Sequence, residues 1–285
     1  MYVCQQTEEG LTWTHDYMLK PIKQLIELIC AVLYIPLLSF LKKSPLRVVL
    51  YYHSINKADV IGFTKQMAYL AEKCIVVKPS KIKSAHTDGA KILAAITFDD
   101  AFVSILENAV PILKEHRLPA GIFVPTGNLG QPPRWKIPEN CCTQNEAVMS
   151  HRQIVELDND GFEIFSHTLS HPVLSEIEDD KLDTELVKSK QELERILNHE
   201  VIGISYPHGA YDDNVCKAAL RAGYSMGFTI EPYTNDEFTD NMKIGRFSVS
   251  PRDNMTKFKL KVSGAYQAVR FLRVLKTLVV RFIGR

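Results

Sequence analysis

Two adjacent carboxylates, Asp99 and Asp100, directly follow an apolar segment that ends at Phe98. Neighbouring carboxylates repel each other, so such a pair is costly unless a cation binds there or the two groups have separate roles. Aspartate is also common in Asx turns and at helix N-caps. The pair alone therefore leaves a structural role open beside a catalytic one.

Two histidines, His167 and His171, follow a second apolar segment and are separated by three residues. Their imidazoles can converge on one ion if the chain turns between them, and neutral imidazole is a common zinc ligand. Two surface histidines on a loop would have the same spacing. With Asp100, however, they make one carboxylate and two imidazoles, which is the ligand count of a catalytic metal site with open positions for water and substrate.

The elements that must position these residues follow a βα pattern, because short β-branched runs alternate with amphipathic segments from Arg47 onward. We expect strands over residues 47–52, 91–98, 120–125, 162–166, 201–205, 225–229 and 243–248. Helices are expected over residues 63–73, 105–116, 152–159, 181–198 and 214–222. The connection from Thr126 to Met149, which contains Trp135, is long enough to be a lid or a binding loop.

Most of the candidate catalytic and metal-binding residues lie where an expected strand ends. This is true of His53, Asp99, Asp100, His167 and the segment 206–209. In a barrel of parallel strands the carboxyl ends converge on one face, where active sites are built. The sequence therefore predicts a single site at that face.

The segments Thr97-Phe98-Asp99-Asp100 and Gly161 to Leu174 resemble the first two motifs of the polysaccharide deacetylase family, the NodB-homology class of carbohydrate esterases. The resemblance covers roughly residues 47–250. It implies an α/β fold, a distorted (β/α)7-type barrel with terminal helical extensions. Phe165 stands where this family often has glycine, and we expect the change to affect packing behind the site more than the ligands.

The resemblance also implies roles for the residues of the two motifs. Asp99 is the expected general base, while Asp100, His167 and His171 are the expected ligands of one divalent cation, for which we expect zinc. The backbone N–H of His208 is the expected donor to the oxyanion.

Two features depart from the commonest family pattern. Ser205 stands where an arginine usually orients the base, and Arg246 matches a compensating arginine in a late strand, although it could also be a salt-bridge residue that closes the barrel. The family's C-terminal histidine motif is absent. Leu50 to His53 instead resembles the circularly permuted exopolysaccharide N-deacetylases, which makes His53 the expected general acid; a histidine that merely ends a strand is the alternative.

The implied activity is metal-dependent hydrolysis of the N-acetyl group of amino sugars in a polysaccharide or a lipid-linked glycan. One alternative is a deformylase or deacetylase of a lipid-linked monosaccharide. Another is a catalytically inactive glycan-binding barrel, but loss of Asp99 or of a metal ligand would have favoured it and none is lost. The formal net charge of +1 gives no field that would favour nucleic acid.

The catalytic domain is expected over residues 46–252, preceded by an N-terminal extension over residues 1–45. Within that extension, residues 25–41 are apolar but interrupted by Glu27 and Pro36. A membrane-spanning helix needs roughly 20 predominantly apolar residues, so a span, interfacial attachment and a buried helix all remain open.

A basic amphipathic helix is expected over residues 253–285, because residues 257–285 include eight Lys or Arg and no acidic residue. Such a helix can lie on an anionic membrane surface, or it can dock on the barrel with its cationic side in solvent. We expect peripheral membrane contact. Lys42, Lys43 and Arg47 weakly favour a cytoplasmic catalytic domain under the positive-inside tendency.

Overall fold

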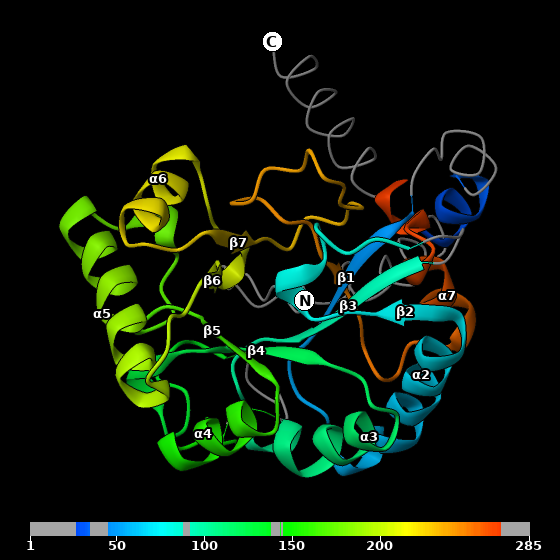
Figure 1. The fold of residues 1–285 in the computed structure, drawn as a ribbon, viewed down its shortest axis with the longest axis horizontal. Coiled ribbons are helices and arrows are strands. Elements are labelled where there is room, and N and C mark those ends of the chain that lie inside the picture. Colours follow the sequence, from blue (N-terminus) through cyan, green and yellow to red (C-terminus); the bar gives the residue numbers. More distant parts are fainter. Residues whose placement is uncertain (1–26, 35–44, 88–91, 138–142, 144, 269–285) are drawn as a thin grey trace, which may run out of the picture.

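A computed structural model describes residues 27–34, 45–87, 92–137, 143 and 145–268. Its centre is a sheet in which every paired strand is parallel, in the order β7-β6-β5-β4-β3-β1-β8, with β2 also paired to β3 (Figure 1). The strands are β1 Arg47–Tyr52, β2 Cys74–Val76, β3 Ile92–Phe98, β4 Ala120–Val124, β5 Glu163–Ser166, β6 Gly203–Ser205, β7 Met226–Phe228 and β8 Phe247–Ser248.

The segment that ends in β8 brings the two edges of the sheet together. Ile244 forms a parallel bridge with Phe228 of β7, while Phe247 and Ser248 pair with β1. The sheet therefore curls into the distorted α/β barrel that the sequence predicts.

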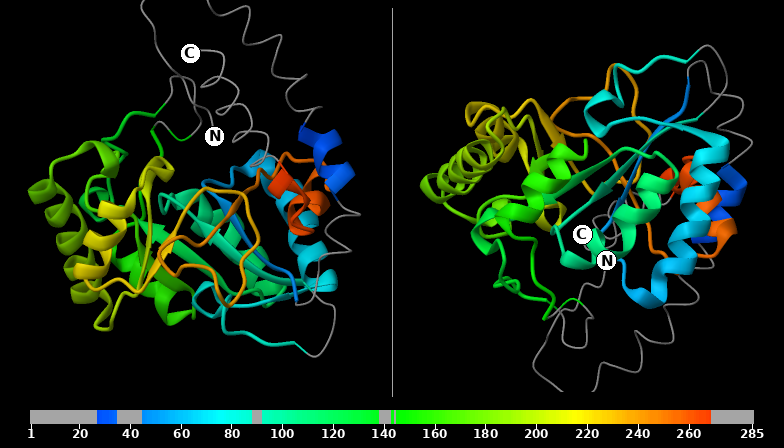
Figure 2. Two further views of the ribbon diagram at one scale, coloured as in Figure 1. Left: turned by 90° about the horizontal axis from the view of Figure 1, so that it is seen from above. Right: turned by 60° about the horizontal axis from the view of Figure 1, so that its bottom comes forward.

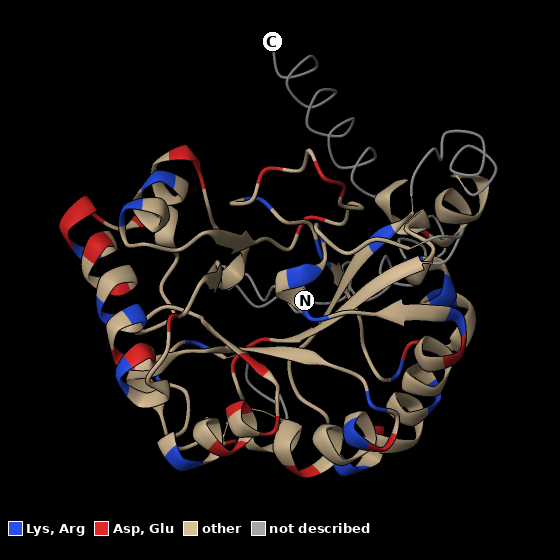
Figure 3. Cartoon of the chain, in the orientation of Figure 1, with Lys and Arg blue, Asp and Glu red and all other residues tan. Residues whose placement is uncertain are grey.

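Helices surround the sheet on its outer side (Figures 1 and 2). They are α2 Val60–Lys73, α3 Val110–Glu115, α4 His151–Asn159, α5 Asp179–Leu197, α6 Asp213–Arg221 and α7 Met255–Val262. Charged residues are spread along the helices, whereas the strands contain few of them (Figure 3). This distribution follows from amphipathic helices that bury one face against a sheet buried on both sides.

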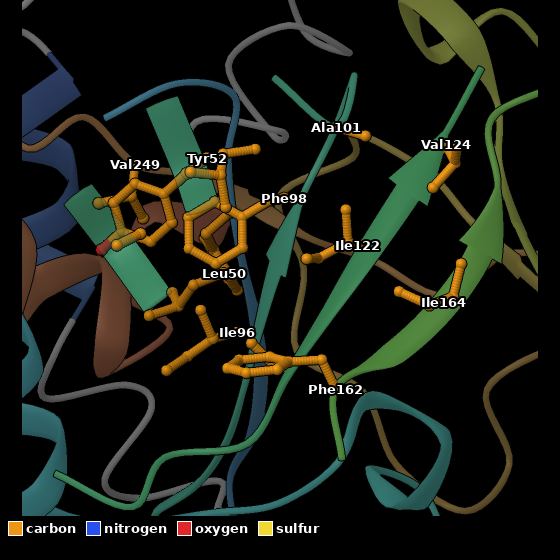
Figure 4. Close-up of a cluster of buried hydrophobic side chains, with 14 of the residues drawn as sticks. Leu50, Tyr52, Ile96, Phe98, Ala101, Ile122, Val124, Phe162, Ile164 and Val249 are labelled. Atoms are coloured by element: carbon orange, nitrogen blue, oxygen red, sulfur yellow. The ribbon is translucent and has the colours of Figure 1, made fainter. Parts of the chain in front are cut away.

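Alternate residues of each strand point to opposite faces of the sheet, which gives the protein two apolar layers. The larger of the two clusters of buried apolar side chains lies on the side of the sheet that faces the helices. It includes Leu50 and Tyr52 of β1, Ile96 of β3 and Ile122 of β4 (Figure 4). Toward the barrel interior points a smaller cluster, which comprises Val49, Ile82, Leu93, Ala95, Phe123, Phe165, Met226, Phe228 and Ile244. The interior layer forms the floor beneath the strand ends.

Phe165 fills this interior and needs space that its neighbours provide. Its ring stacks on Phe123 at 5.2 Å between centroids. A Cβ atom on Gly121 would lie 2.8 Å from the Phe165 ring, and one on Gly203 would lie 2.6 Å from it. The phenyl ring is therefore accommodated by glycines on both adjacent strands, and it packs behind the site as the sequence predicts.

One strand was not expected, and two expected elements differ in detail. Strand β2 was not predicted, because its three residues directly follow α2 without a turn signal. The expected strand 243–248 is regular only at Phe247 and Ser248, since the Arg246 N–H bonds to the Glu231 carbonyl at 2.9 Å outside the sheet ladder. The expected helix 105–116 begins as a π-helical turn, Ile105–Ala109, ahead of Pro111, whose nitrogen has no hydrogen to donate.

The segment expected as a C-terminal helix begins within the core. Phe258 and Val262 of α7 are fully buried against the barrel, while residues 269–285 lie outside the described residues. A short helix over residues 27–34 covers part of the apolar N-terminal run and packs Ala31 against the core. No helix in the described part of the chain is both long enough and apolar enough to span a bilayer.

Candidate active site

The structure brings Asp100, His167 and His171 together at the carboxyl ends of β3 and β5. His167 Nε2 lies 3.5 Å and His171 Nε2 lies 3.4 Å from Asp100 Oδ1. One ligand atom from each residue can be chosen so that all three lie within 4.8 Å of one another, and all three side chains are buried. A carboxylate oxygen and two imidazole nitrogens converge as they would around a single ion.

The state of these three groups suits a cation. Burial lowers the pKa of His167 to about 4 and lowers the pKa of His171 well below its ordinary value, so both imidazoles are neutral and keep a lone pair. Burial and the neighbouring charge of Asp99 raise the pKa of Asp100 well above its ordinary value. Among the described residues Asp100 Oδ1 has no hydrogen-bond partner, which is costly for a buried oxygen unless a cation binds there.

The ring of His167 is held by its other nitrogen. Its Nδ1 lies 2.8 Å from the Ser205 carbonyl oxygen, which can only accept, so Nδ1 carries the proton. Nε2 is then the nitrogen with the free lone pair, and it points toward Asp100. Metal-binding histidines in proteins are oriented by this kind of hydrogen bond.

Asp99 lies beside this group but is bonded to an arginine. Arg246, which is fully buried, donates from Nη1 to Asp99 Oδ1 at 2.7 Å and from Nη2 to Oδ2 at 2.9 Å. Burial raises the pKa of Asp99, but the charge and hydrogen bonds of Arg246, together with the nearby His167 and His53, outweigh burial and hold this pKa below its ordinary value. The two adjacent aspartates are thus separated in state, one paired with arginine and one facing the histidines.

Arg246 is itself fixed by the ends of neighbouring strands. Its Nη2 donates to Ser205 Oγ at 2.7 Å and its Nε donates to the Thr229 carbonyl at 2.8 Å. The guanidinium also lies 4.5 Å from the centre of the Tyr51 ring. Ser205 therefore leaves room for, and binds, an arginine that arrives from a different strand, in the segment that closes the barrel.

The backbone around these residues is strained. Among the described residues seven non-glycine residues have a positive φ, and five of them are at this site: Asp100, Ala101, Thr168, His171 and His208. Such conformations cost free energy and are retained where the surrounding structure enforces them, typically at functional sites. The strain marks the same strand ends that the motifs mark.

Comparison with known proteins agrees with this geometry. The sequence profile of the polysaccharide deacetylase family matches residues 86–227. The chain is 26% identical over 212 residues to YxkH of Bacillus subtilis (strain 168), whose name places it among the polysaccharide deacetylases, and the match covers 71% of each chain. The chain belongs to the polysaccharide deacetylase family.

Two further similarities bear on the fold and the subgroup. The Streptococcus pyogenes deacetylase PplD, solved in complex with acetate, superimposes with a TM-score of 0.64 at 24% identity over 78% of this chain and 99% of that one, which confirms the barrel. A poly-β-1,6-N-acetyl-D-glucosamine N-deacetylase of Staphylococcus aureus (strain MSSA476) is 29% identical over 163 residues. The match covers 52% of this chain and 53% of that relative, so the chain spans about half of its length.

The other two residues expected at the site lie at its rim. His53 follows β1, has an exposed side chain and packs edge-on against Tyr51 with 5.7 Å between ring centroids. His208 lies in the turn Pro207–Gly209, with an exposed side chain whose ring is 4.6 Å from that of His171. Both side chains are therefore exposed, whereas the aspartates and the other two histidines of the site are buried.

Two residues at the site were given no role of their own from the sequence, although Trp135 lies in the connection expected to be a lid or a binding loop. Glu185 of α5 accepts hydrogen bonds from the Leu169 N–H at 3.0 Å and the Ser170 N–H at 2.8 Å, and so holds the loop between the two histidines. Trp135 stacks on His171 with 4.6 Å between centroids. Their spacing from the motifs carries no signal, because both come from elements that only folding brings to the site.

Proposed function

We propose that this polysaccharide deacetylase hydrolyses the N-acetyl group of amino sugars in a glycan and that it depends on a divalent cation. The observation that carries the proposal is the convergence of Asp100, His167 and His171 beside an aspartate, Asp99, that is held ionised by Arg246. A closed structural metal site would be filled by four protein ligands, whereas three ligands leave a position for water and substrate.

Asp100, His167 and His171 would hold the cation, for which we propose zinc, since two neutral imidazoles and one carboxylate suit zinc. When bound, a cation of this kind polarises an amide carbonyl and lowers the pKa of water. The orphaned Asp100 oxygen and the two lone pairs fit that assignment.

Asp99 is the proposed general base. It is ionised, lies next to Asp100 in the chain and has both oxygens oriented by Arg246, so it can take a proton from an attacking water. Arg246 therefore acts as a positioning residue that also keeps the base charged.

The remaining steps are assigned to the two rim residues. The backbone N–H of His208, in its left-handed turn, is the proposed donor to the oxyanion of the tetrahedral intermediate. His53, which follows β1 and has an exposed side chain, is the proposed acid that protonates the departing amine. The amide C–N bond breaks as that proton arrives, and acetate and the free amine leave.

For the substrate we propose an N-acetylglucosamine-containing exopolysaccharide or lipid-linked glycan. Two observations support it: the similarity to the Staphylococcus aureus poly-β-1,6-N-acetyl-D-glucosamine deacetylase, and the histidine at the end of β1 in place of a C-terminal one. A deformylase or deacetylase of a lipid-linked monosaccharide would use the same residues, so substrate assays must separate the two.

We also propose that the protein contacts a membrane surface from the cytoplasmic side. The helix over residues 27–34 leaves Ile29 48% and Leu33 72% exposed, and it continues an apolar run in the sequence. The basic residues of the C-terminal segment would add on the order of 1 kcal/mol each near an anionic leaflet. Co-sedimentation with anionic liposomes tests this, and truncation after Ala268 should weaken it while leaving deacetylation of a soluble oligomer intact.

The decisive experiment combines metal analysis with acetate release from β-1,6-linked N-acetylglucosamine oligomers. The purified protein should contain one divalent ion per chain and release acetate, and His167→Ala or His171→Ala should lose both. His86→Ala, which alters an exposed histidine away from the site, should lose neither. Full metal content in both ligand variants would show that the ion binds elsewhere, and metal-loaded protein without acetate release from any N-acetylated glycan would favour an inactive binding barrel.

A further inference from the structure

The two histidines of the site are held in different ways. His167 is oriented by the hydrogen bond from Nδ1 to the Ser205 carbonyl. His171 Nδ1 is buried and has no hydrogen-bond partner among the described residues. Metal-binding histidines usually donate their second nitrogen to an oxygen acceptor, and this bond fixes both ring orientation and tautomer. The acceptor that orients His167 therefore has no counterpart at His171 Nδ1 among the hydrogen bonds of the described residues.

Aromatic rings surround His171 instead. The Trp135 ring lies nearly parallel to it, at 4.6 Å and 26°, whereas the rings of His167 and His208 stand nearly perpendicular, at 4.7 Å and 4.6 Å. One stacked ring and two nearly perpendicular rings at these distances leave the imidazole little freedom to rotate about its χ2 angle. Such aromatic contacts have preferred geometries and contribute beyond simple burial.

Trp135 is placed on His171 by the loop that follows β4. The Thr126 N–H donates to the Thr168 carbonyl at 3.1 Å, and the Gly127 N–H donates to the Leu169 carbonyl at 2.7 Å. A Cβ atom on Gly127 would lie 2.6 Å from the Leu169 oxygen, so the close approach of the two loops requires glycine there. The loop that carries Trp135 and the loop that carries His171 are therefore bonded to each other.

We propose that Trp135 is a positioning residue for the metal site, and that its stacked indole replaces for His171 the hydrogen bond that orients His167. The inference rests on the proposed function, because it assumes that His171 binds a cation. It assigns to the Thr126–Met149 connection, which the sequence marks as a lid or binding loop, a role in preparing the site before substrate arrives.

The test compares Trp135→Leu, which keeps apolar bulk, with Trp135→Phe, which keeps an aromatic face. Arg134→Ala alters an exposed neighbour on the same loop and serves as the control. Zinc affinity is measured by competition with a chromophoric chelator, and the visible spectrum of the cobalt-substituted protein reports ligand geometry. The loss of an orienting contact predicts zinc binding weaker by about 10- to 100-fold in Trp135→Leu. Trp135→Phe should lie closer to the wild type, and Arg134→Ala should equal it.

Tryptophan fluorescence gives an independent readout. The chain has two tryptophans, and the other one is Trp13, so a Trp13→Phe background leaves only Trp135 to report. Cobalt, which absorbs in the visible and is paramagnetic, should quench this fluorescence strongly, and His171→Ala should abolish the quenching.

The outcomes separate this inference from the proposed function. If the wild type binds no divalent ion, the proposed function fails and this inference fails with it. If the wild type binds zinc and Trp135→Leu binds it equally tightly, with an unchanged cobalt spectrum, Trp135 does not position His171 and only this inference is wrong. Circular dichroism of the metal-free variants shows whether each is folded, and weaker binding by a folded Trp135→Leu supports the inference.

Discussion

Replacing Arg246 by methionine is the sharpest perturbation that the site offers. The variant keeps most of the apolar bulk but leaves the Asp99 carboxylate buried without the two hydrogen bonds that it now receives. Breaking a buried ion pair by removing one partner costs about 3–5 kcal/mol. For a domain of this size each kcal/mol lowers the melting temperature by about 2–4 °C, so we expect a decrease of about 6–20 °C.

The stability lost in Arg246→Met should depend on pH, and the direction of this dependence follows from the pKa of Asp99. In the wild type the pKa of Asp99 is below its ordinary value, so the pair contributes stability at pH values above 3.8 and loses it as the pH falls through the lower folded-state pKa. Without Arg246 the largest lowering influence is gone, burial dominates over the nearby His167 and His53, and the pKa of Asp99 rises instead. The stability difference between Arg246→Met and the wild type should therefore narrow as the pH falls from 7 toward 4, and the acidic limb of the rate profile should move to higher pH.

A double-mutant cycle with Asp99→Asn decides whether loss of the Arg246–Asp99 ion pair causes the lower stability of Arg246→Met. Each single change leaves one buried group unpaired, whereas the double variant removes both charges, so the coupling free energy should be about 2 kcal/mol. Urea unfolding of the four proteins measures it. Arg221→Met, which breaks an exposed pair with Asp183, should cost less than about 1 kcal/mol. Additivity within about 0.5 kcal/mol at Asp99 and Arg246 would refute the reasoning.

Three further changes test other parts of the structure. Asp100→Asn should lose metal and activity together, whereas Asp99→Asn should keep the metal and lose activity; equal metal loss in elemental analysis would contradict this division of roles. His53→Ala should slow turnover by about 10²- to 10⁴-fold with unchanged metal content, and near-normal rates would return it to a structural role. Gly203→Ala should cost about 1–3 kcal/mol in thermal unfolding because its Cβ meets the Phe165 ring, and Phe165→Leu in the same chain should recover most of that loss; a full cost in the double variant would exclude the clash.

The sequence by itself determined where most of the strands lie along the chain and which residues are candidate ligands. Hydrophobic periodicity is a local property, and it located six of the seven expected strands to within two residues at either end. Asp99 and His167 could be found because each directly follows such a strand, and Asp100 and His171 because they lie within five residues of the same strand ends. Parallel strands must end at one face. The resemblance of these short motifs to a family was then enough to predict the barrel.

Local sequence could not place the residues that support the site, because their partners are far apart in the chain. Arg246 and Asp99 are separated by 147 residues, and only the closing of the barrel by the last strand segment brings their side chains within bonding distance. The sequence left two roles open for Arg246, as a partner of the expected base or as a salt-bridge residue that closes the barrel. In the structure it pairs with Asp99 and lies in the segment that closes the barrel, so its position fits both roles.

The tertiary structure alone also decided which groups are charged and which rings orient the ligands. Burial lowers the pKa of His167 and raises that of Asp100, and the stacking of Trp135 on His171 depends on two loops that meet only after β4 and β5 have paired. Motif residues are specified by neighbours in the chain, and so they can be read locally. Desolvation, ion pairing and ring packing depend on neighbours in space, and so they are fixed only when the chain has folded.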